Sequence, residues 1–157
     1  MAKVCLSLGS NIAPEEHLKQ AVERLREMLP VLAVSRAWKS PAVGSGGPDF
    51  LNAAVLVDTW LNSSMLKQQV LRPIERSLGR ERGEDKYAPR TIDIDIVVYA
   101  SEVLDPLLWT QAYLALPVAE LLPELVEPIS GETLESIASR LVSLAGVSPS
   151  PDVLEGE

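Results

Sequence analysis

The sequence predicts an α+β domain of the ferredoxin-like split βαβ class, an antiparallel sheet with helices packed on one face plus C-terminal helices. The apolar segments follow the order strand, helix, strand, strand, helix, strand, and then helices, which is the order of that class. The chain of 157 residues has no internal repeat and no linker that would divide it, and it is long enough for a hydrophobic core. We therefore expect a single domain over residues 1–147 and a disordered tail over residues 148–157.

The first half of the chain contains three predicted strands and one helix. Residues 3–8, "KVCLSL", are rich in apolar side chains, and the following "GSN" ends this strand. Pro14 suits the first turn of a helix, and the apolar residues after it recur at helical spacing. Residues 31–39 and 50–60 predict the second and third strands, separated by a loop rich in glycine and proline.

The second half begins with a predicted helix that Asn62 or Ser63 caps and that reaches about Leu78. Pro73 lies inside this pattern and should bend the helix or mark a boundary. A long polar loop follows, and then a strand that contains two aspartates. The remaining apolar segments predict a short helical turn and a helix, at residues 117–125 and 132–145.

Composition excludes several classes of function. The formal net charge of −8 disfavours nucleic acid as a partner, because a phosphate-tracking surface needs the opposite sign. Cys5 is the only cysteine and His17 the only histidine, which excludes a disulfide or a cysteine-rich zinc site and makes a serine or cysteine triad improbable. The sequence has no membrane-spanning apolar run and no signal-peptide pattern, so we expect a cytoplasmic protein without membrane partners.

The segment "APRTIDIDIVVYA" sets two carboxylates on one face of a strand. Asp93 and Asp95 lie two residues apart, so their side chains point the same way at a separation of roughly 6.6–7 Å. At an effective dielectric constant near 20, two such charges repel by about 2.4 kcal/mol. Two interpretations are open: a strand face exposed to water, or a pair of ligands for magnesium ions that carry nucleotide phosphates.

The loop before this strand favours the second interpretation. Four cations, Arg80, Arg82, Lys86 and Arg90, lie between Gly79 and the strand, and this combination of cations and carboxylates suits a polyphosphate. The sequence has neither a P-loop nor a kinase glycine loop. "LGSN" at residues 8–11 adds a turn whose backbone N–H groups at Gly9 and Ser10 could face a ligand, although an ordinary strand-to-helix turn has the same sequence.

Four segments, "SLGSN", "SPAVG…PDFLNAAV", "IERSLGRER" and "APRTIDIDIVVY", together resemble the hydroxymethyldihydropterin pyrophosphokinase family of folate biosynthesis. The likeness runs from about Val4 to Tyr99 and resumes in "LPVAELLPELVEP". The resemblance implies a ferredoxin-like fold, with ATP and two magnesium ions as cofactors. It also implies transfer of pyrophosphate from ATP to the hydroxymethyl group of a reduced pterin, with release of AMP.

The resemblance also assigns roles to individual residues. It implies that Asp93 and Asp95 bind magnesium, and that Arg80, Arg82, Arg90 and Asp95 take part in catalysis. The implied ATP-binding residues are Glu75, Lys86, Tyr87, Arg90 and Ile96. The implied pterin-binding residues are Gly9, Ser10, Ser40, Pro41, Val43, Phe50, Asn52 and Tyr113. Asp95 is the nearest candidate for a general base.

The chain departs from the family pattern at residues 101–116, which are shortened. The family has a histidine and an arginine here that help to hold the triphosphate, and this chain has neither, because the arginine position reads Gln111 or Ala112. Such charge-assisted contacts are typically worth about 1.5–3 kcal/mol each. Three functions therefore stay open: the family reaction, a paralogue that acts on a different pterin-like alcohol, and a weakened module that binds nucleotide or pterin. We take a monomer as the default oligomeric state.

Overall fold

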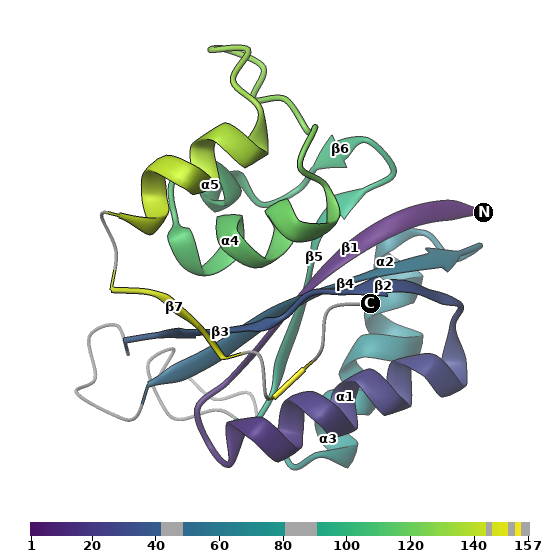
Figure 1. Ribbon diagram of the computed structural model, residues 1–157. Helices are drawn as coiled ribbons and strands as arrows, with labels where there is room; N and C mark the ends of the chain where they lie inside the picture. The colour runs from purple at the N-terminus through teal and green to yellow at the C-terminus, as the bar shows by residue number, and fades with distance from the viewer. Residues whose placement is uncertain (42–48, 81–90, 144–145, 151–152, 155–157) are drawn as a thin grey trace.

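A computed structural model describes residues 1–41, 49–80, 91–143, 146–150 and 153–154. The described residues form one antiparallel sheet with the strand order β6-β5-β1-β4-β3-β7, in which β2 also pairs with β4 (Figure 1). The strands are β1 (Ala2–Ser10), β2 (Val31–Val34), β3 (Ala37–Ser40), β4 (Phe50–Thr59), β5 (Asp93–Tyr99), β6 (Glu102–Val103) and β7 (Ser148–Ser150).

One face of the sheet is covered by the helices α1 (Pro14–Met28) and α3 (Arg72–Ser77) (Figure 1). Val4, Leu6 and Leu8 of β1 point to this face, where they join the buried leucines of α1 and the isoleucines of β5 in the larger core cluster. Burial of this apolar surface is the main force that holds the layers together. The predicted ferredoxin-like class, with an antiparallel sheet and helices on one face, is confirmed.

The C-terminal helices α4 (Ala112–Leu121) and α5 (Leu134–Val142) cover part of the opposite face (Figure 1). Cys5, Ala54 and Val97 of the sheet pack there against α4 and α5. Glu120 of α4 fastens this layer to β3, because its carboxylate accepts hydrogen bonds from the backbone N–H of Arg36 and from Nε1 of Trp38. α4 is thereby held above the sheet, and the sheet surface beyond its first turn stays open.

The helical segment after β4 has three continuous parts, α2 (Ser63–Leu66), a π-helical turn η1 (Lys67–Leu71), and α3. Asn62 caps it, since its Oδ1 accepts the N–H of Met65 at 2.8 Å. Proline cannot donate a backbone hydrogen bond, and Pro73 lies at the second residue of α3, directly after the π-helical turn. The predicted boundary at Pro73 is confirmed.

Two other predicted elements need correction. Residues 31–39 do not form one strand. The strand is interrupted at Ser35, which separates β2 from β3, and both strands pair with β4. The Oγ of Ser35 accepts the N–H of Ala54 at the break, so the polar groups stay bonded without a continuous ladder. α4 begins at Ala112, five residues before the predicted helical turn.

The disordered tail predicted for residues 148–157 also differs from the structure where that segment is described. Ser148–Ser150 form β7, which pairs with β3. Val153 and Leu154 are buried in the core cluster beneath α1. The prolines of this segment suggested disorder. Burial of the two aliphatic side chains offsets part of the conformational entropy that the segment loses on ordering. The single-domain boundary at residue 147 stays a prediction.

Candidate active site

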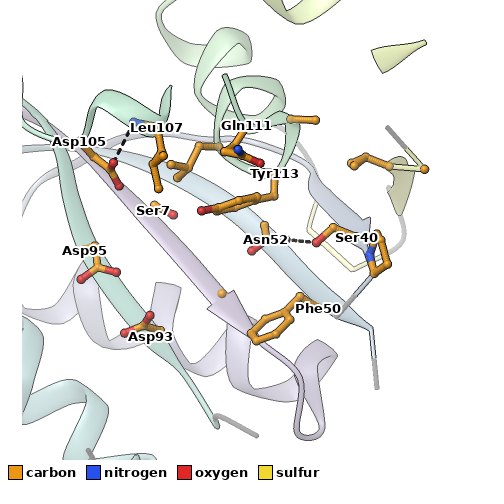
Figure 2. Close-up of a pocket in the computed structure, with 16 residues that line it drawn as sticks. Ser7, Ser40, Phe50, Asn52, Asp93, Asp95, Asp105, Leu107, Gln111 and Tyr113 are labelled. Atoms are coloured by element: carbon orange, nitrogen blue, oxygen red, sulfur yellow. Dashed lines mark hydrogen bonds between the residues drawn. The ribbon is translucent and has the colours of Figure 1, made fainter. Parts of the chain in front are cut away.

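A cavity of about 680 Å³ lies between the open part of the sheet and the beginning of α4 (Figure 2). Its floor comes from β1, β3, β4 and β5, and its roof from α4 and the preceding 3-10 turn η2 (Pro106–Trp109). This volume is within the usual range of small-molecule sites. The described lining residues are Ser7, Gly9, Ser40, Pro41, Phe50, Asn52, Asp93, Asp95, Asp105, Leu107, Gln111, Ala112, Tyr113, Leu114, Gly146 and Val147.

Asp93 and Asp95 both face this cavity (Figure 2). Antiparallel pairing sets Gly9 of β1 opposite Asp93 and Ser7 opposite Asp95. Since Gly9 and Ser7 carry little side-chain volume, nothing bulky on the neighbouring strand covers the carboxylates. The side chain of Asp93 is 18% exposed and that of Asp95 is 50% exposed. The two carboxylates therefore line a cavity and are not simply part of a wet outer face.

An arginine accompanies each aspartate. Nη2 of Arg80 lies 3.9 Å from Oδ1 of Asp93, and the Arg80 side chain is only 11% exposed. Nη2 of Arg72 lies 3.7 Å from Oδ1 of Asp95. Both distances are longer than a hydrogen bond, so each is an electrostatic pairing that offsets part of the repulsion between the two carboxylates.

The opposite end of the cavity combines an amide with aromatic rings. Nδ2 of Asn52 donates to Oγ of Ser40 at 2.8 Å, which fixes the orientation of the carboxamide. A Cβ atom on Gly9 would lie 3.0 Å from Oδ1 of Asn52, so any larger residue here would crowd the carboxamide. Phe50 and Tyr113 approach from the floor and the roof (Figure 2). This end can take a flat heterocycle that offers hydrogen-bonding edges.

The roof contributes polar groups to the cavity, and none of its described lining residues is positively charged. Oδ1 of Asp105 accepts the N–H of Leu107 at 3.0 Å and so caps η2. Gln111 and Ala112, the two positions where the family pattern suggested an arginine, both line the cavity. Trp109 packs against the apolar cluster under α4. The shortened segment therefore closes over the cavity with a carboxylate and an amide.

Three other predicted residues, Ser10, Glu75 and Ile96, are not among the cavity-lining residues, and their predicted roles stay predictions. Glu75 is 1% exposed and lies behind β5, where its Oε2 accepts the N–H of Ile94 at 2.7 Å. The side chain of Ile96 is buried in the cluster on the α1 face. Gly9 and Ser10 belong to β1 and do not form a turn, and Oγ of Ser10 donates to the carbonyl of Ile12. Predicted residues outside the described part of the chain are Val43, Arg82, Lys86, Tyr87 and Arg90.

Three polar or charged residues at the site were not predicted. Ser7 could have been found from the period of two in β1, since it shares a face with Gly9. Asp105 precedes a proline, which is the pattern of a capping residue at a short helical turn. Arg72 lies three residues before Glu75 on a helix, a spacing typical of an ion pair, but the sequence alone does not indicate which strand this pair meets.

The carboxylates fit a magnesium ion that a nucleotide brings to the site. Magnesium usually takes one or two protein carboxylates and completes its shell with phosphate oxygens and water. Two aspartates on one face of a cavity satisfy that requirement. Among the described residues no group of three or more histidine, cysteine, aspartate or glutamate side chains forms a cage, so these residues do not provide a metal site made by protein alone.

Comparison with known proteins identifies one family. The model of "7,8-dihydro-6-hydroxymethylpterin-pyrophosphokinase (HPPK)" matches residues 5–123. The chain is 32% identical over 148 residues to a 2-amino-4-hydroxy-6-hydroxymethyldihydropteridine pyrophosphokinase of Aquifex aeolicus, covering 86% of this chain and 89% of that protein. A Bacillus subtilis protein of the same name is 33% identical over 141 residues, covering 82% and 83% of the two chains.

Solved structures agree on the fold. The wild-type HPPK-DHPS of Plasmodium falciparum superposes with a TM-score of 0.71 at 12% identity and covers 90% of this chain. This chain spans only 41% of that longer protein, so the similarity concerns one part of it and supports the fold alone. No described helix is long and apolar enough to cross a membrane.

Proposed function

We infer the function of the chain from the family to which it belongs, the 7,8-dihydro-6-hydroxymethylpterin pyrophosphokinases. The chain transfers the pyrophosphoryl group of ATP to the hydroxymethyl group of hydroxymethyldihydropterin and releases AMP, a step of folate biosynthesis. One observation of this molecule carries the proposal. The two aspartates of β5 and the fixed carboxamide of Asn52 line one cavity, so a phosphate donor and a heterocyclic acceptor can meet there.

The pterin occupies the end formed by Asn52, Phe50 and Tyr113. Asn52 supplies a carbonyl oxygen to the edge of the heterocycle, because one N–H of its amide donates to Ser40 and holds the carboxamide in place. Phe50 and Tyr113 flank the ring system and exclude water. A buried amide of fixed orientation rejects an analogue that lacks the matching donor far more strongly than an apolar wall would. This end therefore selects the acceptor.

The phosphates of ATP lie toward Asp93 and Asp95. We propose that these two carboxylates hold two magnesium ions, which when bound neutralise charge on the triphosphate and on the leaving AMP. Arg80, which is already beside Asp93, adds a fixed positive charge at the same end. We assign the same task to Arg82 and Arg90, and contacts with the nucleotide to Lys86 and Tyr87.

The reaction is an in-line displacement at the β-phosphorus. The hydroxymethyl oxygen forms a bond to this phosphorus while the bond to the oxygen that bridges the α- and β-phosphorus atoms breaks, and that oxygen leaves with AMP. The hydroxyl proton passes to the carboxylate of Asp95, the more exposed of the two aspartates. Since positioning and electrostatic stabilisation dominate phosphoryl transfer, the chain contributes mainly by holding both substrates in line.

The direct test is AMP formation from ATP and magnesium in the presence and absence of hydroxymethyldihydropterin. The proposal predicts AMP only with the pterin, together with an equal amount of diphosphorylated pterin. Tight ATP binding without AMP would favour the weakened binding module. AMP with another pterin-like alcohol, but none with hydroxymethyldihydropterin, would favour the paralogue. The cytoplasmic location and the monomeric state stay predictions.

A further inference from the structure

The backbone between the two aspartates lies at an open edge of the sheet. β6 pairs only with Val98 and Tyr99 of β5, so it does not cover Ile94, the residue that separates Asp93 from Asp95. β1 pairs with β5 on the other side, and there Ile94 lies opposite Leu8. A buried backbone N–H or C=O group without a partner is costly, so the outer edge at Ile94 needs groups other than a strand.

Two side chains of α3 supply these groups. Oε2 of Glu75 accepts the N–H of Ile94 at 2.7 Å, and Nη1 of Arg72 donates to the carbonyl of Ile94 at 3.0 Å. Arg72 and Glu75 are also joined to each other, with Nη1 and Oε2 3.0 Å apart. The pair thus makes the two hydrogen bonds to the backbone N–H and C=O of Ile94 that a neighbouring strand would otherwise make.

Arg72 links this edge to the cavity. Its Nη2 lies 3.7 Å from Oδ1 of Asp95, while its Nη1 serves Ile94 and Glu75. The guanidinium group is planar and presents several donors in a fixed fork, so Nη1 can bond Ile94 and Glu75 while the fork holds Nη2 beside Asp95 as an electrostatic partner. A lysine keeps the charge but not the fork, because its ammonium group is a compact point charge on a flexible stem.

We propose that Arg72 is a positioning residue of the active site, which fixes the backbone between Asp93 and Asp95 and the carboxylate of Asp95 for magnesium-dependent binding of ATP. This inference rests on the proposed magnesium role of the two aspartates. Residues that orient metal ligands typically change metal affinity or activity by about 10–100-fold when they are replaced. Magnesium demands near-ideal octahedral geometry, whereas calcium tolerates irregular geometry. Misplaced carboxylates should therefore harm magnesium-dependent binding more than calcium-dependent binding.

The test compares the Arg72→Lys variant with the wild-type chain and with an Arg76→Lys control. Arg76 lies on the same helix and is exposed, so its replacement makes the same chemical change away from β5. The probe is an ATP analogue with a methylene group between the α- and β-phosphorus atoms, which cannot transfer pyrophosphate. Its dissociation constant is measured by calorimetry with magnesium and again with calcium, and thermal unfolding is recorded for each variant.

We expect Arg72→Lys to weaken magnesium-dependent binding by about 10-fold or more and calcium-dependent binding by less than about 3-fold. Arg76→Lys should match the wild type in both. Equal losses with the two metals, no loss, or tighter binding with magnesium would overturn the inference. A wild-type chain that binds the analogue equally well without any divalent metal would instead overturn the proposed magnesium role, so the two failures are distinguishable.

Discussion

At the scale of single residues, the acceptor end of the cavity depends on a contact between a glycine and an amide. Asn52 lies opposite Gly9 in the β1–β4 ladder, and its Oδ1 would lie only 3.0 Å from a Cβ atom at residue 9. The hydrogen bond to Ser40 holds the carboxamide in that place. Side-chain orientation here is set by backbone proximity, which no pattern in the sequence reveals.

The Gly9→Ala substitution tests this contact. The added methyl group would lie 3.0 Å from Oδ1 of Asn52, so the carboxamide must move and its bond to Ser40 must weaken. We expect the dissociation constant of the pterin to rise about 10-fold, which corresponds to the loss of one hydrogen bond. Fluorescence titration with the pterin measures it. Unchanged pterin affinity in a folded variant would contradict this role of Gly9.

Cys5 provides a second prediction at this scale. Burial raises the pKa of the Cys5 thiol to about 12, because the thiolate loses its hydration beneath α4. In the unfolded chain the thiol has its ordinary pKa of about 8.5. At a pH of about 8.5, iodoacetamide should therefore label the urea-unfolded chain quickly and the native chain hardly at all, as read by mass spectrometry. Rapid labelling of the native chain would mean that Cys5 is accessible.

Single site residues could be predicted only where a local sequence pattern indicates them. The alternation of isoleucine and aspartate identified Asp93 and Asp95, and the structure brings both to the cavity. Glu75 bonds the N–H of Ile94 and the side chain of Ile96 is buried in the α1-side cluster, so the nucleotide role predicted for these two residues stays a prediction. A strand has two faces and two edges, and the sequence does not indicate which edge is left open.

At the scale of elements, the C-terminal segment contributes to the fold. β7 pairs with β3, and Val153 and Leu154 close the end of the core beside α1. The prolines and the terminal position of the segment predicted disorder, but Val153 and Leu154 pack into the core cluster. Tertiary contacts of this kind override local propensity, and they also explain why α4 begins before its predicted start.

Truncation after residue 147 tests the role of this segment. Loss of two buried aliphatic side chains, less the cost of ordering the tail, should reduce the free energy of unfolding by about 1–3 kcal/mol. The melting temperature should then fall by several degrees, since about 2–4 °C accompany each kcal/mol in a chain of this size. Truncation after residue 154 keeps both side chains and should melt like the full chain. Equal melting temperatures for all three chains would show that the segment does not stabilise the fold.

At the scale of the whole molecule, the topology decides what the site can be. The order of strands and helices was predictable because each element has its own apolar period, and this order brings β1, β4 and β5 side by side. The cavity itself was not predictable, because it depends on how far α4 extends over the sheet. The described roof, with Asp105 and Gln111, adds no positive charge to the cavity, and the proposed magnesium ions would supply it.

Metal removal should therefore abolish turnover without unfolding the protein. The described residues offer carboxylates at the cavity but no group of three metal-binding side chains that would hold an ion within the fold. We expect an excess of EDTA to stop AMP formation while the melting temperature stays unchanged, and magnesium to restore activity in full. A large drop in melting temperature with EDTA would indicate a structural ion.

The central claim is that the aspartates of β5 make this cavity the site of pyrophosphoryl transfer. Its most direct test is the single-turnover rate of AMP formation in an Asp95→Asn variant, compared with Asp58→Asn at the far end of β4, opposite Lys3. Loss of the Asp95 charge should lower the rate by about 100-fold or more at an unchanged melting temperature, because it removes a proposed magnesium ligand and the proposed proton acceptor. Asp58→Asn should match the wild type. A near-wild-type rate in Asp95→Asn would contradict the claim.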